Sequence, residues 1–292
     1  MQLNVTEMLI NFNGKVVPAD QPVLSAKNRS FHFGDGLFES IRVFEGKMPF
    51  FPRHWNRMRL GFERLKFEIP AYFTESLLVN EIQKLTEGKG NWRIRLTVWR
   101  SGGGRYTPEG NLPAFLIEAE MLDSNQFELN QSGLIVGVFQ QFRLPLATSK
   151  PSIIQGFKTT SALHYVLASI YKKEEGLDEC LLLNSGERIV CGSSSNIFVV
   201  KNNELITPPT SDGCIKGTMR GNLLEACKRL NFKVLTVPIT MENLKNADEV
   251  ILTNAISGIQ WIWQVQGLAK NFGYAVALDL LDELNLMVRE QA

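Results

Sequence analysis

The clearest pattern of hydrophobic and polar positions in this chain lies between residues 156 and 201. Apolar side chains recur there at helical spacing and predict one buried stripe on a helix, formed by Ala162, Leu163, Val166, Leu167, Ile170 and Tyr171. Thr159 or Thr160 is placed to cap the start of this helix, and Gly176 is placed to end it. The pattern therefore predicts a helix whose apolar face is covered.

Three short strands are predicted after this helix. Residues 180–183 and 197–200 are continuous apolar runs, and residues 189–190 form a shorter run between them. A turn signal at 184–186 separates the first two strands, and a run of small residues at 192–196 precedes the third. We expect a helix followed by three strands in this part of the chain.

The rest of the chain predicts two domains. Asn13-Gly14 is a two-residue turn signal and predicts a hairpin of residues 9–12 and 15–17. Hydrophobic periodicity predicts further strands at 38–44, 93–100, 113–121 and 134–138, and helices at 51–65, 74–87 and 276–288. Because residues 123–126 are polar and without pattern, we predict an N-terminal α+β domain over 1–123, a linker over 124–132 and a C-terminal domain over 133–292.

Composition and charge exclude several classes of function. The 292 residues are 44% hydrophobic and 21% charged, with a net charge of +1, so no broad attraction to nucleic acid or to a membrane surface is expected. We expect neither a signal peptide nor a membrane-spanning segment. The four cysteines lack C-x-x-C spacing, which favours reduced thiols and a cytoplasmic protein. Three isolated histidines argue against a zinc site, and we expect no metal.

Lys158 stands just before the central helix. A lysine is most often a solvated surface charge, but this one is followed by D-E-C-L-L-L-N-x-G and then by S-S-S-N-I-F. Together these residues resemble the centre of the class IV aminotransferases, which are pyridoxal-phosphate enzymes of fold type IV. The family includes branched-chain and D-amino-acid aminotransferases and aminodeoxychorismate lyases. The resemblance implies that Lys158 binds pyridoxal 5'-phosphate as a Schiff base and serves as catalytic base, which requires a lowered pKa.

Two segments of the N-terminal half resemble the part of this family that meets the substrate. Residues 29–42 match the signature R-x-F-x-F-G-D-G-x-F-E-x-x-R, so the resemblance implies that Phe33, Phe38 and Arg42 line the substrate pocket. The glycine run 102–104 is similar to a loop of the lyase branch and of some branched-chain-like members. Arg100 or Arg105 beside it is a candidate for binding the substrate carboxylate, with a flexible surface loop as the alternative reading.

Other matches concern the phosphate and the ring of the cofactor. Arg57 falls on the family's phosphate-binding arginine, and a guanidinium suits a phosphate because its charge is permanent. Residues 217–220 match a G-x-x-R at a helix start, where unpaired N–H groups favour an anion. The resemblance assigns the remaining cofactor contacts to Ser195, Asn196, Gly217, Thr218, Met219, Asn254 and Ala255.

Cys191 departs from the family pattern. It occupies the place of a glutamate that pairs with the protonated pyridine nitrogen of the cofactor, and a thiol with an ordinary pKa of about 8.5 cannot hold that proton as a carboxylate does. Glu187 is close in sequence, but its offset places it elsewhere on the hairpin. Three alternatives follow: weakened transamination, chemistry that tolerates a less electron-poor ring, or a relic that binds cofactor or a partner without turnover.

The resemblance spans residues 9 to 265. It implies an α+β fold of two domains, a smaller α/β N-terminal domain and a larger barrel-like C-terminal domain, with the cofactor in the cleft between them. It also implies a homodimer that transfers an amino group between a branched-chain-like amino acid and a 2-oxo acid. The alternatives are an aminodeoxychorismate lyase, which the pair Asn254-Ala255 favours, and a non-catalytic relic.

Overall fold

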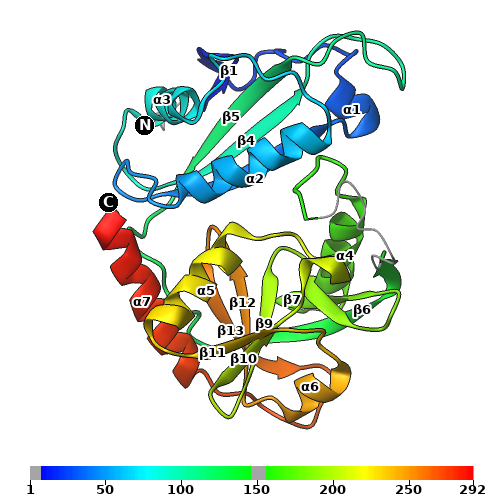
Figure 1. Cartoon of the computed structure of the whole chain (residues 1–292), viewed down its shortest axis with the longest axis vertical. Coiled ribbons are helices and arrows are strands. Elements are labelled where there is room, and N and C mark those ends of the chain that lie inside the picture. The colour runs from blue at the N-terminus through cyan, green and yellow to red at the C-terminus, as the bar shows by residue number, and fades with distance from the viewer. Residues whose placement is uncertain (1–7, 146–155, 292) are drawn as a thin grey trace, which may run out of the picture. The chain divides into compact units, whose positions relative to one another are not determined.

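The computed structural model describes residues 8–145 and 156–291, which form two compact units (Figure 1). The first unit contains the chain up to Asn125 together with Phe157–Ser161. The second contains the rest of the described chain up to Gln291. The short segment that carries Lys158 is therefore grouped with the first unit, although it lies far along the sequence.

The first unit is a five-stranded antiparallel sheet with helices. The sheet order is β2-β1-β5-β4-β3, and its elements are β1 (Leu9–Phe12), β2 (Lys15–Pro18), β3 (Gly36–Val43), β4 (Trp92–Arg100), β5 (Pro113–Met121), α1 (Arg29–Phe33), α2 (Phe51–Arg64) and α3 (Glu75–Thr86). Asn13 and Gly14 have φ values of 51° and 90°, which is the turn geometry predicted for the first hairpin. α2 packs on β3, and α3 packs on β1 and β5.

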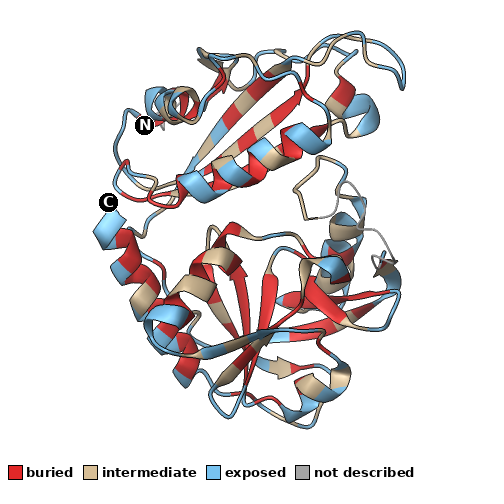
Figure 2. Ribbon diagram, viewed as in Figure 1, coloured by how far each residue is buried: buried red, intermediate tan, exposed pale blue. Residues whose placement is uncertain are grey.

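The core of the first unit lies between its helices and the sheet. α2 contributes Phe51, Met58 and Phe62, and the sheet contributes Ile41 and Ile94, all buried (Figure 2). Along β3, every second side chain faces this core, as an amphipathic strand requires. The helices and strands predicted for this half of the chain are confirmed to within two residues, apart from the unpredicted α1.

The second unit is built on a mixed eight-stranded sheet with the order β11-β10-β9-β12-β13-β6-β7-β8. Its strands are β6 (Leu134–Leu144), β7 (Glu179–Asn184), β8 (Ile189–Gly192), β9 (Asn196–Lys201), β10 (Glu204–Thr207), β11 (Lys233–Thr236), β12 (Glu249–Asn254) and β13 (Gly258–Val265). Its helices are α4 (Leu163–Glu174), α5 (Thr218–Arg229), α6 (Met241–Asn246) and α7 (Ala275–Gln291), with a short 3-10 turn η1 (Thr210–Asp212). The three strands predicted after the central helix are β7, β8 and β9, and they are buried.

α4 differs from its prediction in two ways. The helix begins at Leu163 after Ala162, and no side chain caps it, so neither Thr159 nor Thr160 serves as the cap. The expected buried stripe is also wrong: the exposed fractions are 74% for Leu163, 51% for Val166, 49% for Leu167 and 47% for Ile170. α4 instead packs on the sheet through Ala168, with Tyr165 and Tyr171 partly buried beside it. Hydrophobic periodicity correctly located the apolar face of α4. It did not show whether other parts of the chain pack against that face.

Within the described ranges, no helix is long and apolar enough to cross a membrane. The same residues contain no cluster of His, Cys, Asp or Glu suited to a metal ion. The cysteines Cys180, Cys191, Cys214 and Cys227 are all buried free thiols.

Candidate active site

Lys158 lies at the edge of the first unit's sheet. β3 is the last strand of that sheet, and the segment Phe157–Ser161 runs beside its start. The Phe38 N–H donates to the Lys158 carbonyl at 2.9 Å, and the Thr160 N–H donates to the Gly36 carbonyl at 2.9 Å. These bonds fix the backbone of Lys158, and its Nζ lies 4.6 Å from the centroid of the Phe38 ring.

Gly34 permits this close approach of the two segments. Its φ is +64°, and a Cβ at this position would lie 2.9 Å from the Ser161 Cβ. A larger residue would therefore meet both backbone strain and a steric clash. The glycine of the predicted signature thus shapes the surroundings of Lys158.

Charged groups surround the Lys158 amine. Burial lowers its pKa to about 8, and the neighbouring Arg57 adds to this effect while Glu39 opposes it. An amine with this pKa has an appreciable free-base fraction near neutral pH, as a nucleophile or general base needs. The lowered pKa that the resemblance requires of Lys158 is therefore present in the structure.

Arg57 is held by a buried carboxylate. Its Nε donates to Glu39 Oε1 at 2.8 Å, and its Nη2 donates to Glu39 Oε2. His54, one turn earlier on α2, is joined through Nδ1 to Glu39 Oε2 at 2.7 Å. Burial lowers the pKa of His54, so its ring is neutral at pH 7 and donates from Nδ1 to the carboxylate. The predicted phosphate arginine is thus oriented by Glu39, which is itself bonded to His54.

Sequence reasoning missed Glu39 and His54 as functional candidates. A usable signal was present, because Glu39 shares the inward face of β3 with Leu37, Ile41 and Val43. A charged residue at a core position is rare unless it is paired. The charge that interrupts this apolar alternation therefore pointed to a buried partner.

The two candidate carboxylate-binding arginines have different surroundings. Arg100 is buried, and its guanidinium donates to Asp35, to the carbonyls of Leu65 and Lys66 and to Asn111. Arg105 is exposed on the glycine loop. Arg100 therefore serves to join parts of the first unit, and Arg105 is the better placed of the two to meet a ligand.

Arg29 ties the glycine loop to α1. Its guanidinium bonds Asp35 at 2.7 Å and donates to the carbonyl oxygens of Gly103, Gly104, Arg105 and Tyr106. Phe33 lies 5.5 Å from the Tyr106 ring, measured between centroids. Elsewhere in the unit, Arg42 is partly buried and donates to the Ser124 carbonyl at 2.9 Å. Of the three predicted pocket residues, Phe38 contacts Lys158, Phe33 contacts the loop and Arg42 contacts the end of the unit.

In the second unit, the start of α5 has the features of an anion site. Gly217 is the N-cap, no side chain caps the helix, and its first turn holds no acidic residue. The N–H groups of Thr218 and Met219 lie in that first turn, where a helix leaves its donors unpaired. A Cβ on Gly217 would lie 1.9 Å from Asn196 Oδ1, so only glycine fits. This arrangement suits a phosphate.

Hydroxyl and amide groups beside α5 strengthen this interpretation. Asn196 donates from Nδ2 to the Ile215 carbonyl at 2.9 Å, which fixes the chain just before the helix. Thr253 pairs with Asn196 in the sheet, and its buried hydroxyl has no hydrogen-bond partner in the described structure. The Ser195 hydroxyl is likewise unpartnered among the described residues. Unpaired buried hydroxyls are costly, and an anionic ligand would satisfy them.

The turn after β12 and the two remaining motif matches are structural supports. Asn254 Oδ1 accepts from the N–H groups of Ile256 and Ser257 at 2.9 and 2.8 Å, and this closes the turn that contains Ala255. Arg220 donates to the Thr207 hydroxyl and the Pro208 carbonyl. Arg220, the arginine of the G-x-x-R match, therefore joins the start of α5 to residues 207–208.

Cys191 lies in an apolar cluster that includes Phe139, Leu182 and Cys214. Burial, with the nearby Cys214, raises the pKa of the Cys191 thiol well above its ordinary value, so the sulfur keeps its proton. A neutral thiol cannot stabilise a pyridinium ion as a carboxylate does. The phosphate site therefore fits pyridoxal phosphate, whereas the expected partner of its ring nitrogen does not.

Neither acidic side chain near Cys191 in sequence replaces the missing carboxylate. Glu179 accepts from the Cys180 N–H and the Ser193 N–H at 2.9 and 3.2 Å, and from the Ser193 and Ser194 hydroxyls. Glu187 is exposed and pairs with Arg143 at 2.7 Å. Both carboxylates are already bound to other groups.

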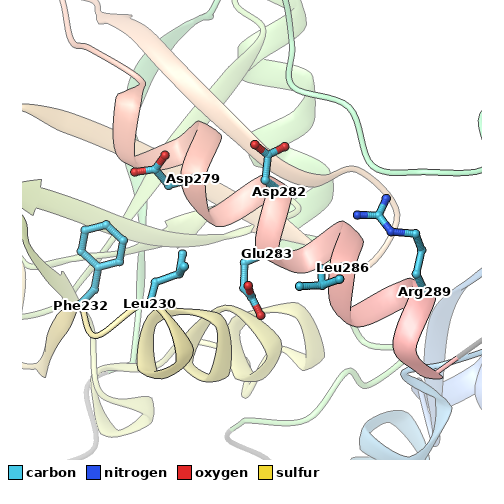
Figure 3. A pocket seen from close by; sticks show the side chains of 7 residues that line it. All are labelled: Leu230, Phe232, Asp279, Asp282, Glu283, Leu286 and Arg289. Atoms are coloured by element: carbon cyan, nitrogen blue, oxygen red, sulfur yellow. The ribbon is translucent and has the colours of Figure 1, made fainter.

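A separate hollow of the second unit lies between the end of α5 and α7 (Figure 3). Its lining is Leu230, Phe232, Asp279, Asp282, Glu283, Leu286 and Arg289. Arg229 bridges the two helices by contacting Glu283 at 3.2 Å and Glu290 at 2.7 Å. Three carboxylates in the lining disfavour a phosphate, and none of the predicted site residues lies there.

Comparisons with known proteins agree on one family. The model of "Amino-transferase class IV" matches residues 36–265. A putative branched-chain-amino-acid aminotransferase of Methanocaldococcus jannaschii is 29% identical over 268 residues, covering 90% of each chain. An aminodeoxychorismate lyase of Vibrio harveyi is 25% identical over 234 residues, covering 80% of this chain and 83% of the other.

Solved structures show the same fold. A branched-chain aminotransferase of Thermoproteus uzoniensis, in complex with norvaline, superposes with a TM-score of 0.84 over 97% of this chain and 96% of its own, at 22% identity. A 4-amino-4-deoxychorismate lyase of Pseudomonas aeruginosa gives a TM-score of 0.79 at 27% identity, covering 94% of this chain and 98% of its own. The α+β fold expected from the resemblance is confirmed. This chain is an enzyme of the class IV aminotransferase family.

Proposed function

We propose that the protein is a pyridoxal-phosphate-dependent aminotransferase acting on a branched-chain-like amino acid and a 2-oxo acid. The observation that carries this proposal is the fixed Lys158 amine, whose pKa is lowered to about 8 beside Arg57. When bound, pyridoxal phosphate supplies an aldehyde that reacts with amines and a ring that withdraws electrons from the substrate α carbon. The protein's residues supply binding, orientation and proton transfer.

Lys158 is the proposed catalytic residue. As a free base, its Nζ would be the amine that holds the cofactor and the general base that moves the proton at the substrate α carbon. The hydrogen bonds that Phe38 makes to Lys158 and Thr160 makes to Gly36 fix the backbone from which the Lys158 side chain extends. Partial burial keeps bulk water away from the proton that is transferred.

The proposed phosphate ligands are main-chain N–H groups and small polar side chains. Thr218 and Met219 donate from the first turn of α5, and Gly217 lets the anion approach the backbone. The hydroxyls of Ser195 and Thr253, which have no partner among the described residues, are donors that a phosphate would use. Arg57 contributes the permanent positive charge, and the turn at Asn254-Ala255 contributes further backbone.

Substrate recognition is assigned to the first unit. Phe33 and Phe38 provide apolar surface for a side chain, Arg42 is a further proposed substrate contact, and Arg105 is the proposed partner of the carboxylate. The branched-chain preference rests on relatives such as that of M. jannaschii.

Aminodeoxychorismate lyase is the second candidate. The turn Asn254-Ala255 resembles the lyase branch, and the 27% identical P. aeruginosa structure is a lyase of this kind. Elimination would need the same Lys158 and the same phosphate contacts. A non-catalytic relic, suggested by Cys191, is the third candidate.

We also propose that the protein is a homodimer. The exposed α4 side chains Leu163, Val166, Leu167 and Ile170 form a stripe at helical spacing, and a two-fold axis would bring the same stripe of a second copy against it. Leu167→Glu should convert the dimer to a monomer in sedimentation, whereas the neighbouring Lys173→Glu should not. Unchanged sedimentation of the Leu167 variant would remove this face from the interface.

The function is tested by spectroscopy of the protein saturated with pyridoxal phosphate. Borohydride should bleach the absorption band and attach the reduced cofactor permanently to Lys158, as peptide mapping would show. Lys158→Ala should lack the band, while Lys173→Ala keeps it. Loss of the absorption band with branched-chain amino acids, and its return with a 2-oxo acid, would support transamination. Pyruvate released from aminodeoxychorismate without an acceptor would support the lyase instead. A colourless protein would exclude both.

A further inference from the structure

Glu39 is a buried carboxylate on the core face of β3. Only 2% of the residue is exposed, and its strand neighbours on that face are Leu37 and Ile41. It receives the Arg57 guanidinium through two hydrogen bonds and the His54 ring through a third. Both partners lie one turn apart on α2, so one carboxylate anchors one face of the helix to the strand.

Stability alone is a poor explanation for this arrangement. Taking two opposite charges out of water costs several kcal/mol per ion. Well-packed apolar residues at the same positions often give a folded state of equal stability. An isolated Arg57 on this face would be free to choose among rotamers, whereas a two-point contact fixes the plane of its guanidinium. The buried group therefore provides orientation.

The charges that face Lys158 come from three elements: Arg57 from α2, Glu39 from β3, and Arg93 and Arg95 from β4. The neutral ring of His54 lies on α2 beside Arg57 and Glu39. Arg95 also lies over the Phe38 ring, 4.1 Å from its centroid, and shares that ring with the Lys158 amine. Glu39 is thus an anion among cationic side chains.

We infer that Glu39 is a positioning residue that holds Arg57 and His54 beside Lys158 and offsets the positive charge of Arg57 there. This inference rests on the proposed function, because that function gives Lys158 and Arg57 their roles. Glu39 itself acts through its neighbours. Its effect should be visible in the protonation of Lys158, even in the protein without cofactor.

The two members of the ion pair should shift Lys158 in opposite directions. Glu39→Gln keeps the shape of the side chain and removes its charge, so protonated Lys158 loses an attractive neighbour and its midpoint falls by roughly one pH unit. Arg57→Gln removes a repulsive neighbour and raises the midpoint by a similar amount. The double variant removes both charges, so its Lys158 midpoint should lie close to that of the parent protein.

The experiment is competitive labelling of the cofactor-free full chain with trace acetic anhydride between pH 6 and 11. Peptide mapping gives the titration midpoint of Lys158, and thermal melting confirms that each variant is folded. Glu120→Gln is the matched control, because Glu120 is an exposed acid on the same sheet, 2.9 Å from Arg93. It should leave the midpoint unchanged.

A Glu39→Gln protein that folds and titrates like the parent would overturn the inference, as would shifts of the same sign in both single variants. If Glu39→Gln does not fold, Arg57→Gln and the double variant decide the question. A Lys158 midpoint that rises in Arg57→Gln and returns to the parent value in the double variant supports the inference. Any other result contradicts it. Cofactor is absent throughout, so failure here is separable from failure to bind pyridoxal phosphate.

Discussion

The first unit surrounds Lys158 with charged side chains, whereas the start of α5 in the second unit presents main-chain N–H groups and hydroxyls. The first arrangement depends on buried ionised groups, with Glu39 held at a pKa of about 2 and Lys158 at about 8. The second depends on backbone geometry, with a glycine that admits no Cβ. We therefore expect changes of pH and charge-removing substitutions to affect mainly the first region. Substitutions that enlarge a side chain should affect mainly the second.

The largest expected effect is on acid stability. Burial opposes ionisation of Glu39, but Arg57 and His54 outweigh it and lower the pKa from 4.5 to about 2. The ionised group therefore stabilises the fold above about pH 4.5, and that stabilisation, on the order of 3 kcal/mol, is lost as the pH falls toward 2. Glu39→Gln should flatten the free energy of unfolding over this range in urea titrations. A slope equal to that of the parent would contradict the account.

The second effect concerns the rate of cofactor capture. Only the free-base amine reacts with an aldehyde, and a pKa of about 8 makes the free-base fraction rise about a hundredfold between pH 6 and 9. Stopped-flow absorbance after mixing with pyridoxal phosphate should show a rate that levels off above pH 8. A rate still rising steeply at pH 10 would indicate an ordinary lysine.

The third effect tests the backbone site. Gly217→Ala places a Cβ against Asn196 Oδ1 and should weaken cofactor binding roughly tenfold to a hundredfold, because the helix start must move. Equilibrium binding of pyridoxal phosphate measures this loss. Gly110→Ala is the control, since a Cβ there meets nothing within 4 Å. Equal affinity in both variants would show that α5 does not hold the phosphate.

The smallest expected effect concerns Cys191. If the missing carboxylate limits the reaction, Cys191→Glu should raise the rate of the amino-acid half-reaction by roughly tenfold, the worth of a charge-assisted hydrogen bond. Single-turnover kinetics measures the rate, and Cys191→Ser controls for loss of the thiol. No change or a fall in rate would favour chemistry that does not need a protonated ring.

Local elements were largely predictable from sequence. The hairpin at Asn13-Gly14, the helices α2, α3 and α7 and the strand β5 follow from turn chemistry and periodicity, which act between residues close in the chain. The motif around Lys158 and the glycine at 217 were also readable, because each requires one residue type at one place. Cys191 was recognisable as a departure by the same reasoning.

Other features depend on residues far apart in sequence, so only the tertiary structure decided them. The order of the eight strands, the packing of Phe157–Ser161 beside β3 and the choice of Arg100 as a buried anchor all require long-range pairing. The exposed stripe of α4 is another example, because hydrophobic periodicity does not reveal which surface packs against a helix face. Sequence alone determined which residue types stand at the predicted site positions. The tertiary structure decided their burial, their neighbours and the direction of their pKa shifts, since these depend on the groups that surround each side chain.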